Sequence, residues 1–204
     1  MTKLVIRELI QPDWPTAAGV AARAFFDEEF MVGMLGTDRL TRLEGSHRLY
    51  SNEPWDVTAL HLAAFAGSTM VGLVRASPRG NCHVCFRIDP TMRPDDEVAA
   101  KEWEFELGVR EVHLRHPEHA WISRVAVEPQ VQGVGVGSTL LKAAVDALAD
   151  RGGALVLLEC LATRESFYSR NGFHHLDDVP DPFAERSFLI AAQVKHLNPV
   201  TVRG

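Results

Sequence analysis

The most informative stretch of the chain is residues 119–141, which read HAWISRVAVEPQVQGVGVGSTLL. Its first nine residues, 119–127, predict a strand, and a run with three alternating glycines follows. Apolar residues over 138–150 recur with helical spacing, which predicts a helix that packs one face on a sheet. The continuous apolar run at 154–160 is typical of a buried strand. The order is therefore strand, glycine-rich turn, helix and parallel strand.

The glycine run suits a ligand that carries phosphate. Glycine tolerates positive φ and lets main-chain N–H groups approach a ligand without a Cβ in the way. Those N–H groups and the positive end of the helix dipole form an anion site that needs no lysine. Three glycines in five positions, Gly133 to Gly137, exceed what a tight turn requires.

A dinucleotide is one ligand that such a turn could hold. Glu159 follows Gly135 at roughly the spacing of the acid that binds a ribose in nicotinamide-nucleotide enzymes. Against this, residues 128–132 separate the strand from the first glycine, and Ser138 stands at the third fingerprint position. Little chain remains to complete a doubly wound sheet. A nicotinamide-nucleotide oxidoreductase is therefore the weaker interpretation.

Coenzyme A is the second ligand class, and here the chain resembles a known family. The segment Val125–Leu141 resembles the acyl-CoA signature of the GNAT acetyltransferase superfamily, in which Arg or Gln is followed after two residues by Gly-x-Gly or Gly-x-Ala. Gln132, Gly135 and Gly137 meet this pattern. An offset register meets it as well, through Gln130, Gly133 and Gly135.

A second signature of the superfamily follows at the expected distance. Residues 166–173 read SFYSRNGF, an aromatic-tyrosine pair followed by Gly172-Phe173. The two motifs occur in the expected order with a strand between them. The resemblance is close over 119–176, is limited to the order of elements over 3–76, and is absent over 77–118.

The resemblance implies an α/β fold with a mixed, mostly antiparallel central sheet flanked by helices. We expect one domain over 1–204 with a helical insertion at about 95–116. It further implies acetyl-CoA as the cofactor, with the main chain of Val125 and Val127 pairing with the pantetheine arm. The pyrophosphate would be held by the N–H groups of Gln132, Gly133, Val134, Gly135, Val136, Gly137 and Ser138.

Catalytic roles follow from the same resemblance and from the chemistry of acyl transfer. Tyr168 would lie near the sulfur and protonate the departing thiolate, a task suited to a phenol whose ordinary pKa is about 10. The amine must be neutral when it attacks, so a general base is expected. Glu159 is the first candidate because it ends a strand lining the split in the sheet, although it could equally hold a backbone N–H or the substrate's ammonium. Weaker candidates are His119, Glu128 and, as a relay through water, Ser123.

Elsewhere the pattern predicts a strand at 3–8 and helices at 16–26, 38–50, 95–114 and 163–170. An antiparallel hairpin is predicted at 57–66 and 69–76, an irregular loop at 77–94 and a last strand at 187–194.

The metal-ligating residue types do not form a recognisable motif. Cys82 and Cys85 make a single CxxC with no second pair, which argues against a zinc knuckle. Three histidines are spaced by three residues, at His113, His116 and His119. Because Pro117 breaks the helix that would align them, we expect these histidines to be exposed to solvent. No metal is expected.

Composition restricts the function classes. The chain has 204 residues and a net charge of −6, which argues against nucleic acid as a partner and favours cationic small molecules. Three cysteines are too few for a disulfide framework, the N-terminal residues lack a signal-peptide pattern, and no run is long enough for a membrane span. We therefore expect a cytoplasmic protein that does not associate with membranes.

These observations predict an N-acetyltransferase that moves an acetyl group from acetyl-CoA to a small, cationic primary amine by direct attack, without an acyl-enzyme. We expect Asp27-Glu28-Glu29 to form a solvated loop, although in the superfamily the matching region often contacts the acceptor amine. Trp55, Trp103 and Trp121 could wall an acceptor pocket or belong to the core. A non-catalytic acyl-CoA sensor is an alternative, and the sequence leaves a protein-lysine acceptor and a homodimer open.

Overall fold

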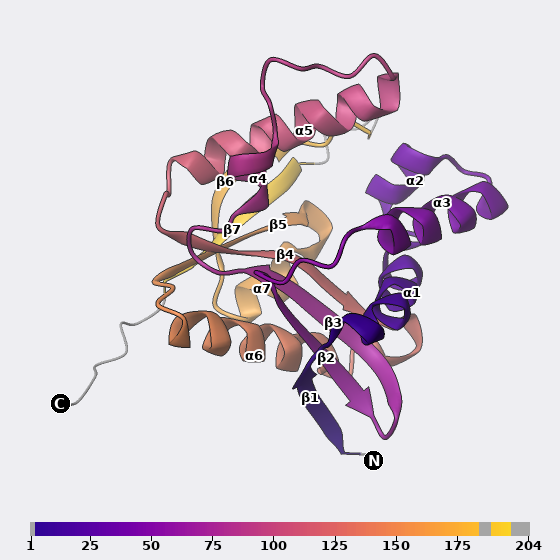
Figure 1. The fold of residues 1–204 in the computed structure, drawn as a ribbon, viewed down its shortest axis with the longest axis vertical. Helices are drawn as coiled ribbons and strands as arrows, with labels where there is room; N and C mark the ends of the chain where they lie inside the picture. The colour runs from indigo at the N-terminus through magenta and orange to yellow at the C-terminus, as the bar shows by residue number, and fades with distance from the viewer. Residues whose placement is uncertain (1–2, 184–188, 197–204) are drawn as a thin grey trace. The chain divides into compact units, whose positions relative to one another are not determined.

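The computed structural model describes residues 3–183 and 189–196 (Figure 1). The strands are β1 (Leu4–Glu8), β2 (Leu60–Ala66), β3 (Thr69–Ser77), β4 (His119–Val127), β5 (Leu155–Leu161), β6 (His174–Pro180) and β7 (Leu189–His196). The α-helices are α1 (Trp14–Phe25), α2 (Glu29–Leu35), α3 (Arg39–Asn52), α4 (His83–Arg87), α5 (Glu97–Leu114), α6 (Val136–Asp150) and α7 (Glu165–Arg170).

The chain divides into two compact units that share two elements. The first unit holds Met1–Ala76 and Ser123–Ala144, and the second holds Ser77–Ile122 and Val145–Gly204. Strand β4 and helix α6 therefore each contribute residues to both units. The expectation of one domain over 1–204 stays a prediction.

In the first unit, β1, β2 and β3 pair antiparallel, and β2 and β3 form a hairpin. The turn of this hairpin uses Gly67 at a φ of +64°. The second half of β4 lies beside β3, because Glu128 donates its N–H to the Val71 carbonyl at 2.9 Å. Gly72 permits this approach, since a Cβ there would stand 2.9 Å from the Ala126 carbonyl oxygen.

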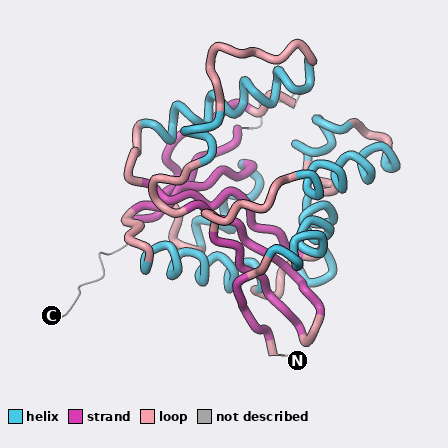
Figure 2. Tube along the Cα trace, viewed as in Figure 1, coloured by secondary structure: helices cyan, strands magenta, loops and turns pink. Residues whose placement is uncertain are grey.

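In the second unit, β4 and β5 pair parallel, from His119 opposite Leu155 to Ile122 opposite Leu158. Strand β7 then pairs antiparallel with β5 on one side and with β6 on the other. Helix α5 packs against α4 and β6. Figure 2 shows α5 as one continuous helix with a loop at each end.

The hydrogen-bonded strand order is β1-β2-β3-β4-β5-β7-β6. Among the described strands, the pairing of β4 with β5 is parallel, and the pairings of β1 with β2, β2 with β3, β5 with β7 and β6 with β7 are antiparallel, so this is a mixed, mostly antiparallel sheet, and helices flank it. The expected fold class is confirmed. A doubly wound parallel sheet, which the dinucleotide interpretation requires, is excluded.

Most predicted elements are present within a few residues of their expected bounds, including the predicted helix at 95–116, which is α5. Three elements were not predicted: α2, the short α4 inside the expected loop at 77–94, and β6. The strand expected at 187–194 corresponds to β7 from residue 189, and residues 187–188 lie outside the described residues. Among the described helices, none combines the length and apolar character needed to cross a bilayer.

Candidate active site

The turn between β4 and α6 is built on two glycines in the left-handed region. Gly133 has a φ of +78° and Gly135 a φ of +93°. A Cβ at either position would meet nothing within 4 Å. The backbone conformation, rather than lack of space, therefore requires glycine at both positions.

The main-chain N–H groups of this turn are available for a ligand. Within the described part of the chain, no backbone acceptor pairs with the N–H groups of Gly133 to Ser138. The first N–H group that bonds back is that of Thr139, which donates to the Gly135 carbonyl at 3.0 Å, and the Thr139 hydroxyl donates to the same oxygen. Helix α6 begins at Val136 and adds its dipole. A row of N–H groups at a helix start fits a pyrophosphate.

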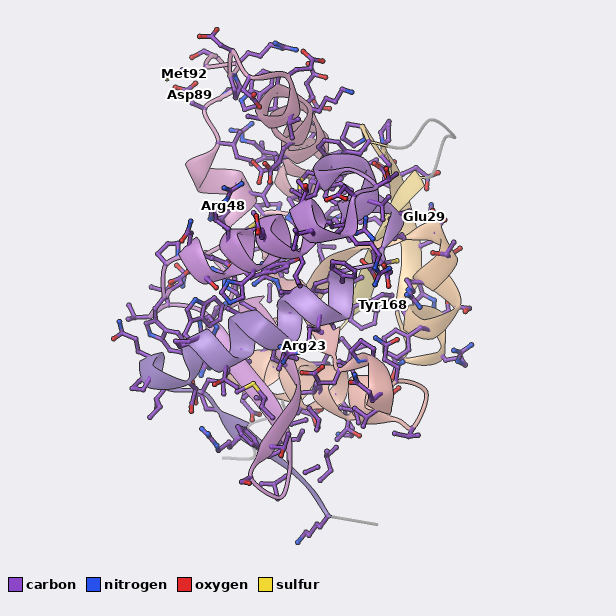
Figure 3. The ribbon with its side chains drawn as sticks, turned by 90° about the vertical axis from the view of Figure 1, so that its right-hand side faces the viewer. Arg23, Glu29, Arg48, Asp89, Met92 and Tyr168 are labelled. Carbon is purple, nitrogen blue, oxygen red and sulfur yellow. The ribbon has the colours of Figure 1, made fainter. Side chains whose placement is uncertain are left out.

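Side chains at both ends of the segment 128–132, which precedes these glycines, fix its position by hydrogen bonds. Gln132 donates its side-chain amide to the Val127 carbonyl at 3.0 Å. Glu128 accepts from Arg23 of α1 through both carboxylate oxygens, at 2.6 to 3.1 Å. Arg23 is labelled on α1 in Figure 3. Its hydrogen bond to Glu128 raises the pKa of the Arg23 guanidinium. Glu128, a weaker base candidate in the sequence, is thus an ion-pair partner.

The first-unit half of β4 adjoins a network of charged residues, of which Arg75 is buried and the others are half-buried. Arg75 of β3 contacts Glu53 and Asp56, each at 3.3 Å, and Arg124 contacts Glu53 at 2.6 Å. The Ser123 hydroxyl exchanges hydrogen bonds with Arg75 at 3.3 to 3.4 Å. Two arginines balance two carboxylates here. The proton relay expected of Ser123 stays a prediction.

Tyr168 lies on α7 in a small aromatic group of the second unit. Its ring centroid is 4.9 Å from that of Phe167 and 6.1 Å from that of Phe173, and Phe173 is fully buried. Its carbonyl accepts the N–H groups of Asn171 and Phe173, which closes the turn around Gly172 at a φ of +83°. The aromatic-tyrosine pair and the Gly-Phe pair are therefore one structural unit, with Tyr168 half-buried on its helix (Figure 3).

Glu159 has both carboxylate oxygens engaged. Trp121 donates its indole N–H to Oε2 at 2.8 Å, and His113 Nε2 lies 2.5 Å from Oε1. Burial lowers the pKa of His113, but the Glu159 carboxylate and the Cys85 sulfur raise it more, to about 9. The structure thus places Glu159 as the partner of a buried histidine.

Comparison with known proteins agrees with these features. The family model described as "Acetyltransferase (GNAT) domain" matches residues 97–175, which include β4, the glycine turn and α7. Residues 97–175 therefore resemble a GNAT acetyltransferase domain. The resemblance expected from the sequence is confirmed, and the matched family model is that of an acetyltransferase. No curated protein sequence matches the chain.

Solved structures show the same fold. A Drosophila melanogaster polyamine N-acetyltransferase, described as forming N-acetylagmatine, has a TM-score of 0.73 and 16% identity, with 96% of this chain and 100% of that chain covered. An agmatine N-acetyltransferase mutant has a TM-score of 0.71 and 17% identity, covering 95% and 99%. PaiA N-acetyltransferase from Thermoplasma acidophilum, in complex with coenzyme A, has a TM-score of 0.57 and 18% identity, covering 96% and 99%.

Two of the three histidines expected to be exposed to solvent are buried. His113 is fully buried and His119 is 2% exposed, so the expectation of solvent-exposed histidines is wrong for both. His116 is half-buried. Helix α5 ends at Leu114, and a turn through Pro117 returns the chain so that the rings of His113 and His119 lie 4.6 Å apart. His119 is therefore not an exposed base at the start of β4.

Cys82 and Cys85 lie beside these two histidines in the second unit. The four ligand atoms, two Sγ and two ring nitrogens, are all within 4.8 Å of one another. The Cys82 thiol lowers the pKa of Cys85 by hydrogen bonding, and His113 and His119 lower it further. Cys82 and Cys85 precede the segment that the GNAT domain model matches. In the fold, two histidines therefore lie beside the cysteine pair, where the sequence shows no second cysteine pair.

Other charged residues were not identified from the sequence. Glu102 and Glu106 are half-buried one turn apart on α5, and burial raises the pKa of Glu106 to about 7. They share a helical stripe with Val109 and His113, and that spacing was a usable signal. Arg75 also interrupts an apolar strand, which is a sign of a buried charge.

The three tryptophans of the expected pocket wall have separate environments. Trp55 stacks on His61 at 4.2 Å in the first unit. In the second unit, Trp103 donates to the Asp89 carbonyl at 3.1 Å, and Trp121 donates to Glu159.

Proposed function

We propose that this protein is an acetyl-CoA-dependent N-acetyltransferase. The observation that carries the proposal is the row of N–H groups from Gly133 to Ser138, free of backbone acceptors among the described residues, at the start of α6. This row lies inside the segment matched by the GNAT domain model.

Acetyl-CoA, when bound, supplies an acetyl group activated as a thioester. The main-chain groups of Val125 and Val127 would bind its pantetheine arm, because the parallel pairing of β4 with β5 ends at Ile122. The pyrophosphate would be bound by the N–H groups of Gly133, Val134, Gly135, Val136, Gly137 and Ser138. The N–H group of Gln132, also expected from the sequence, already donates to the Pro129 carbonyl at 3.4 Å.

Tyr168 would donate its phenolic proton to the departing thiolate. Glu159 was the expected general base, but its carboxylate already accepts from Trp121 and lies against His113. To remove a proton from an amine, it would have to exchange one of these buried partners. We therefore propose Glu159 as a positioning residue for His113.

The acceptor we propose is a small, cationic primary amine. The net charge of −6 favours cations. In the segment Asp27-Glu28-Glu29, Asp27 is bound by Arg39 and Arg42, while Glu29 is exposed (Figure 3). Glu29 is thus our candidate for holding the ammonium. Two of the solved structures with the same fold are described as a polyamine and an agmatine N-acetyltransferase, which supports this choice.

We further propose that the protein is cytoplasmic, because its three cysteines are free thiols, which fits a reducing compartment.

Thermal unfolding with acetyl-CoA, CoA or NADH tests the cofactor, because a ligand of the native state raises the unfolding temperature. We expect saturable stabilisation by the two CoA ligands and none by NADH. Release of free thiol is then followed with agmatine, spermidine, a neutral arylalkylamine and a lysine peptide. Stabilisation without thiol release from any amine would indicate a sensor, and stabilisation by NADH alone would overturn the proposal.

Tyr168→Phe tests the proton donor. The change should lower turnover by about a hundredfold or more, since general acid catalysis contributes on the order of 10²–10⁴. Affinity for CoA should stay within about twofold, because the ring is kept. The matched control is Tyr50→Phe, which removes the other tyrosine hydroxyl of the chain and should retain turnover. Equal turnover in both variants would exclude Tyr168 as the acid.

A further inference from the structure

Four side chains of the second unit converge on one point. They are Cys82 just before α4, Cys85 within α4, His113 in the last turn of α5 and His119 at the start of β4. Their ligand atoms lie within 4.8 Å of one another, and Cys82 Sγ is 3.2 Å from His113 Nδ1. We propose that these four residues bind one zinc ion.

The second nitrogen of each histidine supports a ligand role. His113 turns Nδ1 towards the sulfurs and Nε2 towards the Glu159 carboxylate. His119 places Nδ1 2.6 Å from the His116 carbonyl. A histidine that binds a metal usually donates its other ring N–H to a carboxylate or carbonyl, which fixes the tautomer. Both histidines have such an acceptor.

The remaining nitrogen of His119 is an independent observation. Nε2 of His119 is buried and has no hydrogen-bond partner within the described part of the chain. The residue as a whole is only 2% exposed. A buried ring nitrogen that lacks a partner is costly. Because Nδ1 faces the His116 carbonyl, Nε2 is the nitrogen that His119 would offer to a metal.

Donor type and geometry favour zinc. Two thiolates and two imidazoles are a common donor set of structural zinc sites, whereas calcium and magnesium prefer oxygen ligands. Around a tetrahedral zinc ion, bond lengths of about 2.0–2.3 Å place ligand atoms about 3.3–3.8 Å apart. The separation of Cys82 Sγ from His113 Nδ1, 3.2 Å, is already close to this range, and no separation exceeds 4.8 Å, so the remaining pairs need to approach by at most about 1–1.5 Å.

The site would be structural rather than catalytic. Four protein ligands fill a tetrahedral coordination shell and leave no position for a reactive water. The cysteines also border an apolar cluster that includes Val84, Val109 and Trp121. Zinc would tie the start of α4 to the end of α5 and the start of β4, all within the second unit. This inference does not depend on the proposed acetyl transfer.

Metal content of the purified full chain tests the site. The protein is prepared under reducing conditions, loaded with Zn²⁺, freed of loose metal by desalting and measured by elemental analysis. We expect about one zinc per chain. Replacing zinc by Co²⁺ should give the thiolate charge-transfer and intense d–d absorption of a tetrahedral site with sulfur ligands.

Matched variants separate this site from nonspecific binding. Cys82→Ser and His119→Asn should each weaken zinc binding at least tenfold in competition with a chromogenic chelator. Cys160→Ser and His174→Asn remove the same residue types outside the cluster and should keep about one zinc per chain. The wild-type measurement remains decisive if a cluster variant fails to fold.

Three outcomes would overturn the proposal. One is a wild-type protein that is folded and fully reduced but retains no zinc or cobalt after loading. Another is zinc retained equally by a folded Cys82→Ser variant. The third is a stable disulfide between Cys82 and Cys85 in protein purified under reducing conditions. None of these outcomes bears on CoA binding, so the two proposals fail separately.

Discussion

The glycine turn of the first unit and the cysteine–histidine cluster of the second use opposite means to prepare a binding site. The turn offers main-chain N–H groups from adjacent residues, Gly133 to Ser138, and two glycines at positive φ shape it. The cluster offers four side chains, and its first and last members, Cys82 and His119, are separated by two helices. A main-chain site depends on local conformation. A side-chain site depends on the packing of distant elements and on the identity of each ligand.

This difference predicts that single side-chain changes are most damaging in the cluster. Cys85→Ala should remove the stabilisation that zinc gives, about 4 kcal/mol when free zinc exceeds its Kd a thousandfold. Urea unfolding is measured with zinc and with a chelator. The wild-type protein should lose stability on chelation, whereas Cys85→Ala should be the same in both conditions. A wild-type protein indifferent to the chelator would contradict the prediction.

The same contrast explains which site could be predicted from the sequence. The residues of the turn are contiguous, so their spacing alone indicated a phosphate-binding loop after a strand. His113 and His119 are brought together by a turn in which His116 donates its N–H to the His113 carbonyl and His119 donates to the His116 carbonyl. In the sequence, Pro117 indicated only that no helix could align them. Only the folded structure therefore shows that His113 and His119 lie beside Cys82 and Cys85.

Strand β6 was missed for a related reason. Residues 174–180 read HHLDDVP and lack alternating apolar positions. They form a strand because they pair with β7, from His174 opposite Val194 to Pro180 opposite Leu189. The local pattern does not contain that long-range pairing. Strand β4 and helix α6, whose patterns are strong, lie close to their predicted bounds.

Glu159 offers a sharper test, because it was expected as a base and is proposed as a positioning residue. Glu159→Gln keeps one oxygen for His113 but loses the second acceptor that Trp121 uses. Loss of such an outer partner commonly weakens metal binding by about 10- to 100-fold. We expect that loss in chelator competition. If Glu159 is the general base instead, zinc affinity should stay within about twofold while turnover falls steeply and the pH profile changes.

In the glycine turn, the damaging change is to the backbone. Gly135→Ala places a Cβ on a residue at a φ of +93°, which costs about 1–2 kcal/mol and shifts the neighbouring N–H groups. We expect CoA affinity to fall at least about tenfold by calorimetric titration. Gly36→Ala is the control, because Gly36 has a φ of +88° and a Cβ there would also meet nothing within 4 Å. An equal loss of affinity in both variants would assign the effect to general destabilisation.

The smallest effect should come from a side chain of the same turn. Ser138→Ala keeps the main-chain N–H that the proposal uses and removes only a hydroxyl. If the turn binds CoA through its backbone, affinity should change by less than about twofold, because the proposal assigns no contact to this hydroxyl. Loss of a net hydrogen bond, worth about 0.5–1.5 kcal/mol, would instead lower affinity by about two- to tenfold. The measurement is the same titration as for Gly135→Ala. A tenfold loss would show that the turn also depends on side-chain identity, which would remove the contrast with the cluster.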